Sequence, residues 1–443
     1  MMRKRFGGWA FGAALAATLA TGSAHGQVAG PQPVEVTALA APDFFSIGSG
    51  EGGLGPELWR GASGETLRTV LPLLSAKPLS PAAQALTRRV LATGANGPEG
   101  AGSDAEVAGA RINALIAAGA VRDASAILSR TSSLERSPGL ARAGAEAALL
   151  AGEDDRACAI ADSLTTGRED AYWLRLRAYC ETRAGKAEAQ LTFDLAQSVE
   201  RDAVYGRLMG AKLAGSGDPG AASLRNGLDY ALSRNLGLDL TGVKAAPAVE
   251  TALAAKEAGP ARWKIEDGPG ELKAAMAAVA AGDLAKAQAL RAGLVADATP
   301  VNDLALLDGL IAAASGRPDG PTLDRLVERG SVGEAKVRGK MQNAAIVLAA
   351  FGAPMSPQAR GEFAKFAGAE AGKATVARGM ALDLAGEAKL PGETALLALW
   401  ISADAGAGGP AVGDRARIVR ALRAAGLEED ARAFAVEGLL AQR

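Results

Sequence analysis

Glycines recur at a nearly constant spacing through most of this 443-residue chain, and each ends a stretch rich in alanine, leucine and isoleucine. The intervals from Gly119 to Gly152 and from Gly152 to Gly185 are both 33 residues. A second series has intervals of 34, 36, 34 and 40 residues and consists of Gly282, Gly316, Gly352, Gly386 and Gly426. The 97 residues between the two series are close to three periods, with Gly215 or Gly217 as an irregular member. A period near 34 with two apolar stretches per unit predicts an array of helical hairpins.

The residues around these glycines are also repeated. Alanine stands five residues after the glycine in four copies, at Ala124, Ala157, Ala287 and Ala431, and a looser copy has Ala189 four residues after Gly185. A glycine can end the first helix because it adopts positive φ without steric cost. The acidic triplets 153–155 and 428–430 then fall on the first turn of the second helix, where they favour the positive end of its dipole. The alanine lets the two helices approach closely, and neighbouring hairpins must stack to bury their apolar faces.

The segment Ala281-Gly-Asp-Leu-Ala-Lys-Ala-Gln-Ala-Leu290 resembles the tetratricopeptide repeat superfamily. The resemblance extends over about 105–200 and 270–443, although most large aromatic positions of the first helix are missing; Tyr172-Trp173 is an exception. It implies an all-α fold, an α-α superhelix or solenoid of hairpins over 104–443, with an extended concave surface for a peptide or a partner protein. The segments Leu58–Gly61, Arg88–Leu91 and Arg175–Cys180 are also similar to alanine-rich exported proteins of alphaproteobacteria.

The N-terminal 26 residues have the pattern of a secretory signal peptide. Three basic residues, 3–5, precede an apolar stretch from Phe6 to about Ala20, and Ala24-His25-Gly26 supplies small residues for cleavage after Gly26. A transmembrane anchor is the alternative, but the stretch is shorter than the ~20 residues that span a bilayer. We therefore expect a cleaved, periplasmic protein without stable membrane insertion.

Between the signal peptide and the repeats, two further segments are expected. Residues 27–63 are rich in proline and glycine and predict a flexible tether. Residues 64–103 predict an N-terminal helical segment with helices near 65–74 and 80–91, where Ser80 can cap the second helix and Pro81 fits its first position.

Charge and histidine content exclude several classes of function. Removal of the signal peptide leaves 45 basic residues against 49 acidic ones, so nothing favours a nucleic-acid partner. The single histidine, His25, lies in the signal peptide, so the mature chain cannot use a Ser-His-Asp triad or a histidine-ligated metal. We expect no metal and no cofactor.

The two cysteines, Cys158 and Cys180, lie on either side of a turn expected at 165–167. In an oxidising compartment two such cysteines usually pair, and the alternative is two buried free thiols. A Cys-x-x-Cys redox motif is absent from the sequence.

Other motifs do not meet the requirements of a site. Residues 48–53 match Gly-x-Gly-x-x-Gly without the preceding strand that a dinucleotide site needs, and 368–374 lacks the spacing and the hydroxyl of a phosphate-binding loop. The acidic triplets lack the alternating ligands of a calcium loop. Three tryptophans, Trp59, Trp173 and Trp400, are expected to pack in the core rather than to stack on a ligand.

These observations favour a non-enzymatic periplasmic scaffold or adaptor that binds a peptide or protein partner through a solenoid groove. The alternative is a carboxylate-dependent hydrolase or lyase of envelope glycan such as peptidoglycan, for which the aperiodic stretch 215–270 offers Glu266. A third class is a structural component of the cell surface. No residue is predicted to be catalytic.

Overall fold

The computed structural model describes residues 42–50, 53–132, 134–258, 263, 265, 270–295, 299–367 and 372–442. The chain divides into two units, Met1–Ala41 and Pro42–Arg443, and all the described residues belong to the second unit. The predicted signal peptide, His25 and the first part of the predicted tether lie outside the described residues.

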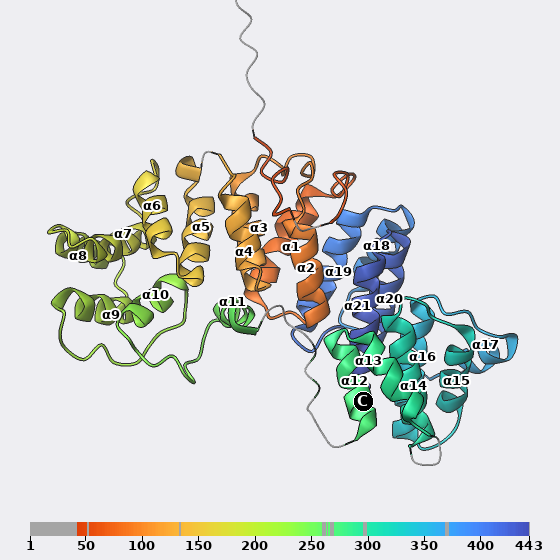
Figure 1. Ribbon diagram of the computed structural model, residues 1–443. Helices are drawn as coiled ribbons and strands as arrows, with labels where there is room; N and C mark the ends of the chain where they lie inside the picture. The colour runs from red at the N-terminus through yellow and green to blue at the C-terminus, as the bar shows by residue number, and fades with distance from the viewer. Residues whose placement is uncertain are drawn as a thin grey trace, which may run out of the picture. The chain divides into compact units, whose positions relative to one another are not determined.

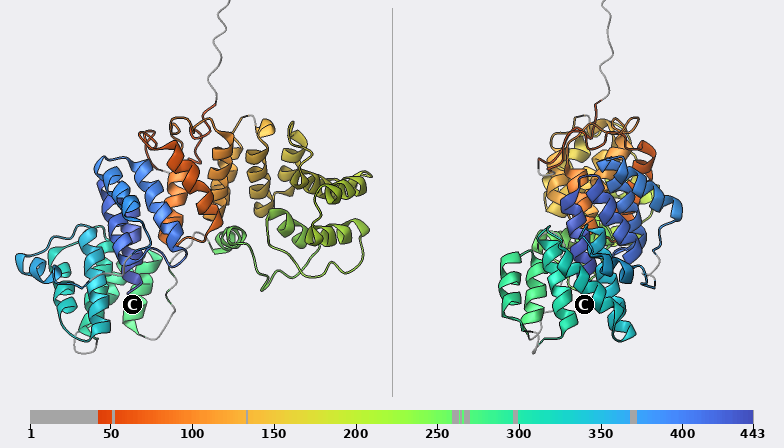
Figure 2. Two further views of the ribbon diagram at one scale, coloured as in Figure 1. Left: turned by 180° about the vertical axis from the view of Figure 1, so that it is seen from behind. Right: turned by 90° about the vertical axis from the view of Figure 1, so that its right-hand side faces the viewer.

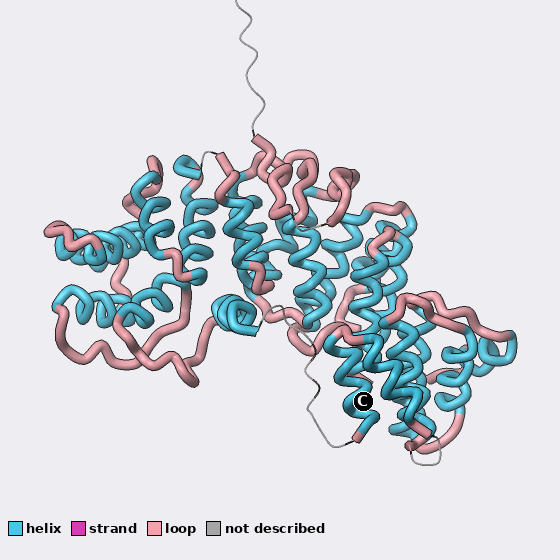
Figure 3. The backbone as a smooth tube through the Cα atoms, in the orientation of Figure 1, coloured by secondary structure: helices cyan, strands magenta, loops and turns pink. Residues whose placement is uncertain are grey.

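The described residues fold into 21 α-helices and one short 3-10 helix, with no strand among them (Figures 1 and 3). The all-α prediction is therefore confirmed. The first ten helices are α1 (Gly64–Ala76), α2 (Pro81–Ala92), α3 (Ala105–Ala117), α4 (Val121–Leu128), α5 (Pro138–Ala151), α6 (Asp154–Ser163), α7 (Ala171–Arg183), α8 (Ala189–Val199), α9 (Ala203–Ala214) and α10 (Gly227–Asn235). The remaining helices are α11 (Pro247–Ala258), α12 (Glu271–Ala281), α13 (Leu284–Gly293), α14 (Val301–Ala314), α15 (Gly320–Ser331), α16 (Ala335–Ala350), α17 (Pro357–Phe363), α18 (Val376–Glu387), α19 (Pro391–Ala405), α20 (Val412–Ala424) and α21 (Glu428–Leu440).

One turn geometry joins the helices of most hairpins. Seven of the eight glycines predicted to end helices have positive φ, between 66° and 96°. At each of them, as at Gly152, its own N–H bonds to the carbonyl three residues back and the next N–H to the carbonyl four residues before the glycine. These are the two hydrogen bonds of a Schellman motif, which satisfies the last carbonyls of the first helix. The four alanines five residues after the glycine are fully buried, as the close approach of the helices requires.

Gly386 is the exception. Helix α18 continues through it, and the turn follows at Lys389, the one non-glycine residue with positive φ in the described part of the chain. A Cβ on Gly386 would lie 2.9 Å from the Cα of Ala421. This glycine is therefore required where α18 crosses α20, and the prediction that it ends a helix is wrong.

The hairpins do not pack strictly in chain order. Helix α1 contacts α3 on one side and α19 on the other, and α2 contacts both α3 and α21. The N-terminal hairpin thus lies between the helices that follow it and the last helices of the chain (Figures 1 and 2). Helix α11 folds back onto α3 and α5.

The segment before α1 is packed rather than free. Phe44, Phe45, Leu58 and Trp59 are buried in the core. The guanidinium of fully buried Arg111 donates to the carbonyls of Phe44, Ile47, Leu91 and Thr93, which fixes the segment to the end of α2. The boundary predicted for the tether at residue 63 is therefore too late, because the packed unit begins by Phe44.

Two cores are formed, a large one and a smaller one made by α5–α10. Trp59 and Trp173 are almost fully buried, in the large and the small core respectively. Trp400 is partly buried, and the Arg378 guanidinium lies 4.1 Å from the centre of its ring. Trp59 and Trp173 therefore pack in the core, as predicted, whereas Trp400 packs at the edge of the core beside Arg378.

Candidate functional site

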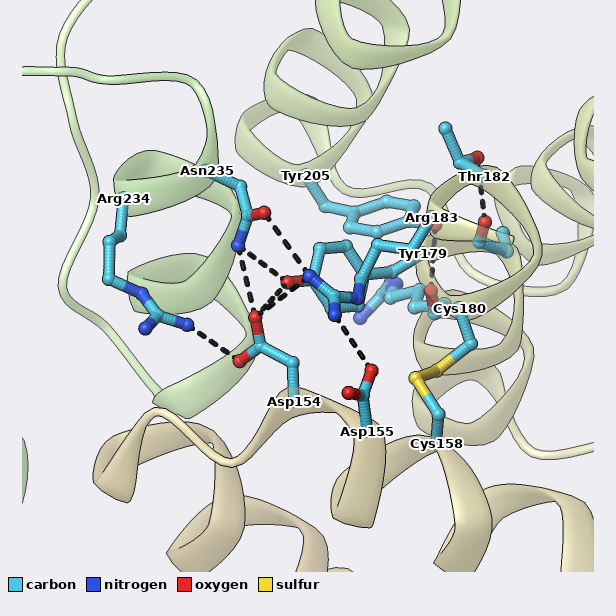
Figure 4. Close-up of a disulfide and its surroundings, with 12 residues drawn as sticks. Asp154, Asp155, Cys158, Tyr179, Cys180, Thr182, Arg183, Tyr205, Arg234 and Asn235 are labelled. Carbon is cyan, nitrogen blue, oxygen red and sulfur yellow. Dashed lines mark hydrogen bonds and ion pairs between the residues drawn. A yellow bond between two sulfur atoms is a disulfide. The ribbon is translucent and has the colours of Figure 1, made fainter. Parts of the chain in front are cut away.

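The disulfide lies in the smaller core. Cys158 on α6 and Cys180 on α7 are bonded, with 5.6 Å between their Cα atoms (Figure 4). The predicted pairing is confirmed, and the alternative of two free thiols is wrong. Because α6 ends one hairpin and α7 begins the next, the bond joins two successive hairpins. A disulfide of this kind indicates a non-reducing environment.

A buried carboxylate beside the disulfide connects three helices. Asp154, in the first turn of α6, accepts hydrogen bonds from the Tyr179 hydroxyl (2.9 Å), Arg183 (3.2 Å) and Asn235 (3.2 Å), and Arg234 donates to its other oxygen at 2.6 Å (Figure 4). Burial raises the pKa of the Tyr179 phenol, and the neighbouring Asp154 raises it further. Asp154 thus ties α6 to α7 and α10, which is more than the helix-dipole role predicted for the acidic triplet.

The same arrangement occurs in two other hairpins. Asp123, in the first turn of α4, pairs with Arg88 at 2.8 Å, and Asp430, in the first turn of α21, pairs with Arg89 at 2.6 Å. Both carboxylates are buried. Burial raises the pKa of Asp430 to about 6, although Arg89 opposes the shift. In these three hairpins, a buried aspartate in the first turn of the second helix forms an ion pair with an arginine of another hairpin. We call each of these pairs an ionic clamp.

A cleft of about 740 Å³ lies among α5, α7, α9 and α10, lined by residues of both charges, including Arg142, Tyr172, Arg175, Asp202 and Asp229. The acidic groups of this cleft are engaged in hydrogen bonds and ion pairs within the protein. Asp202 accepts hydrogen bonds from the Tyr205 N–H and from Arg225; burial acts to raise its pKa, but these contacts outweigh it and keep the pKa below its usual value. The Asp229 carboxylate accepts from Ser223 and Arg225.

Glu146 lies next to this cleft, and its buried carboxylate is a candidate for a general acid. Burial raises its pKa, as a general acid requires. Both of its oxygens are engaged, however: Oε1 accepts from the Tyr172 hydroxyl at 2.9 Å, and Oε2 accepts from the Gly227 N–H at 2.6 Å. Gly227 is the first residue of α10, so Glu146 fixes the start of that helix to α5.

Two helices expose a row of large apolar side chains. On α18 the row consists of Val376, Met380 and Leu384, with exposed fractions of 75, 55 and 61 %. On α8 it consists of Leu191, Leu195 and Val199, with 72, 49 and 53 %. A spacing of four residues puts each row on one helix face, and we call them the α18 stripe and the α8 stripe.

Neither stripe is predicted from the sequence. Each helix has a buried apolar face, with Leu382 and Ala385 in α18 and Ala189 and Ala196 in α8, and the stripe is a second apolar face beside it. In an alanine-rich chain two adjacent apolar faces have the same sequence pattern as one wide buried face.

Of the other predicted residues, Glu266 lies outside the described residues, as do 368–371 of the phosphate-loop candidate. Within the described ranges, no group of three or more acidic or cysteine residues could hold a metal ion. None of the described helices has the length and hydropathy needed to cross a membrane.

Comparison with protein-family models, with curated proteins and with solved structures finds no match. The resemblance to tetratricopeptide repeats therefore depends on the repeat pattern of the chain itself.

Proposed function

We propose that this chain is a non-enzymatic scaffold of the bacterial periplasm, exported with cleavage after Gly26, whose helical hairpins form an α-α superhelix and bind a protein partner. The disulfide supports a location outside the reducing cytosol. The repeated turns, the buried alanines and the ionic clamps support a rigid array of hairpins, the architecture that presents extended binding surfaces.

The α18 stripe is the observation on which the binding role depends. Three large apolar side chains on one face, each more than half exposed, cost free energy in water unless another molecule covers them. A partner helix with apolar residues three and four positions apart would cover such a row.

Charge beside the stripe indicates the character of that partner. Arg417 and Arg420 on α20 share the carboxylate of Asp383, at 3.3 Å each, and their side chains are 40 and 66 % exposed. Exposed Glu387 lies three residues after Leu384 on the same helix face, so two cations and two anions border the stripe. The partner we propose is therefore an amphipathic helix whose apolar face is flanked by side chains of both charges.

A site-specific cross-link tests this proposal. A photo-reactive amino acid replaces Met380 in the full chain, in the cells that produce it, and the same amino acid replaces Val332 as a control of similar exposure, 53 %. We expect a discrete cross-linked protein from position 380, identified by mass spectrometry, which Leu384→Asp removes. The same products from both positions, or none from position 380, would contradict the proposal.

Among the described residues the hydrolase alternative has no support of this kind, because both carboxylates with a raised pKa are engaged: Glu146 at both oxygens, and Asp430 with Arg89. Incubation of the mature protein with purified peptidoglycan gives an independent check. We expect no soluble fragments, and their release would overturn the scaffold proposal.

A further inference from the structure

The α8 stripe lies on a helix with few neighbours. Helix α8 makes its main contacts with α7, its partner in the hairpin, and with α9. Its buried residues, Ala189, Thr192 and Ala196, face those two helices, and the stripe lies on another face. Figure 1 shows α7 and α8 (yellow-green) beyond α5 and α6, with α9 (green) below them at the same end. Helix α8 is therefore one of the two helices that form this end of the array.

The last unit of a repeat array normally presents a polar outer face, because nothing stacks on it. Leu191, Leu195 and Val199 give α8 the apolar face of an internal unit instead. This is the surface expected of an end that is completed by another molecule.

The charges at the two ends of the stripe indicate which molecule this is. Exposed Glu188 lies directly before the helix and exposed Arg201 shortly after it, whereas Glu200 pairs with Arg175 of its own chain at 3.2 Å. The stripe therefore has an available negative side chain at one end and an available positive one at the other. If α8 of a second copy packs antiparallel with Leu195 on the two-fold axis, Leu191 meets Val199 of the second copy and Glu188 lies near its Arg201. The helix dipoles are then also opposed, whereas a parallel pair would place like charges together.

We propose that the α8 stripe is a self-association surface, through which two copies of this chain form an antiparallel, two-fold symmetric dimer. The proposal is independent of the partner proposed for the α18 stripe, because the two stripes lie on different helices that belong to different hairpins.

The oligomeric state tests the proposal. Sedimentation velocity and light scattering of the mature chain, over about a hundredfold range of concentration, should show a monomer–dimer equilibrium. Leu195→Glu places two carboxylates against each other on the axis and should leave only monomer. Met380→Glu is the matched control, because Met380 is similarly exposed (55 % against 49 % for Leu195) but lies on α18, and it should leave the dimer unchanged.

A charge exchange tests the antiparallel register. Glu188→Arg and Arg201→Glu should each raise the dissociation constant about three- to tenfold, as expected for the loss of exposed ion pairs. The double variant should return it toward the wild-type value. A wild-type chain that stays monomeric throughout, a dimer that survives Leu195→Glu, or a dimer that Met380→Glu abolishes would overturn the proposal, and failure of the double variant to recover would overturn the register.

Discussion

At Lys389 the backbone adopts φ of +54° in a turn where the other hairpins place glycine. The turn has the same two hydrogen bonds as the glycine turns, from Lys389 N–H to Gly386 and from Leu390 N–H to Ala385. The lysine side chain is exposed, so it contributes no buried contact that offsets the strained conformation.

We therefore expect Lys389→Gly to stabilise the protein by about 0.5–1 kcal/mol, because glycine adopts positive φ without steric cost. Gly426→Ala is the matched test in the opposite direction. Its φ is +82° and no atom lies within 4 Å of the position of the new Cβ, so a loss of about 1 kcal/mol would come from the backbone alone. Urea denaturation measures both changes. A loss of stability in Lys389→Gly would show that the lysine side chain contributes to the turn.

The raised pKa of Asp430 predicts a specific pH dependence. Because burial raises this pKa from 3.8 to about 6, the folded protein binds a proton at this site more tightly than the unfolded chain does. The contribution of Asp430 to the free energy of unfolding therefore falls as the pH rises from 4 to 6.5, by about 2 to 3 kcal/mol.

The comparison of wild type with Asp430→Asn isolates this contribution, since the variant cannot titrate at position 430. As the pH rises from 4 to 6.5, the unfolding free energy of the wild type should fall relative to that of Asp430→Asn. A flat difference for Asp430→Asn would contradict the raised pKa.

At the scale of elements, the disulfide fixes one hairpin to the next. It closes a loop of 22 residues that includes the turn between α6 and α7. In the chain-entropy model such a loop stabilises the folded state by about 3 kcal/mol. The Asp154 network lies beside it and joins the same two helices, so reduction should loosen α7 and α8 without unfolding the distant helices.

We expect reduction to lower the stability of the α5–α10 core by about 3 kcal/mol, with faster amide hydrogen exchange in α6–α8 and little change in α12–α21. The double variant Cys158→Ala/Cys180→Ala should behave like the reduced protein and should not respond to reductant. Equal exchange rates in reduced and oxidised samples would show that the Asp154 network alone holds these hairpins.

The elements that the sequence predicts correctly are those that depend on local interactions. A glycine with a helix before it and an acidic first turn after it forms its Schellman turn from residues within five positions of each other. The glycine pattern therefore located the turns at Gly119, Gly152 and five further positions. Gly386 could not be told apart from these, because a glycine needed for a helix crossing and a glycine that ends a helix look the same in the sequence.

The features that the sequence did not predict depend on distant residues. Burial of Phe45 and Trp59 depends on packing against residues far along the chain, as when the Gly392 N–H donates to the Leu58 carbonyl. The ionic clamp of Asp154 needs Arg234, which is 80 residues away. The stripes on α8 and α18 are defined by the absence of a neighbour, which no local pattern records.

For the folded unit as a whole, the most consequential contacts join its first and last helices. Glu393 on α19 accepts from the N–H of Ser63 and the hydroxyl of Thr66 at the start of α1, both at 2.9 Å. Glu437 on α21 accepts from the N–H of Ala82 at the start of α2 at 2.8 Å. Each carboxylate satisfies a free N–H at a helix N-terminus and lies at the positive end of the dipole. Helix α1 is also capped locally by the Ser63 side chain, whereas Ser80 makes no side-chain cap bond to α2, so α2 depends on a residue more than 300 positions later for its cap.

Glu437 is the sharpest test of this junction, because its other oxygen pairs with Arg415 at 2.7 Å and both side chains are almost fully buried. Glu437→Leu leaves a buried guanidinium without its carboxylate and an N–H of α2 without its acceptor, so we expect a loss of about 3–5 kcal/mol. Since α2 also holds Asp123 and Asp430 through Arg88 and Arg89, the loss should spread to both sides of the first hairpin, with faster hydrogen exchange in α2, α4 and α21. Asp383→Leu removes a partly exposed carboxylate whose partners, Arg417 and Arg420, stay in contact with water, so it should cost only about 1 kcal/mol. The double variant Arg415→Met/Glu437→Leu should recover much of the lost stability, because replacing both buried charges removes the unpaired cation. If the single variant loses no more than Asp383→Leu, the junction between the first and last helices is held by apolar packing and not by its buried charges.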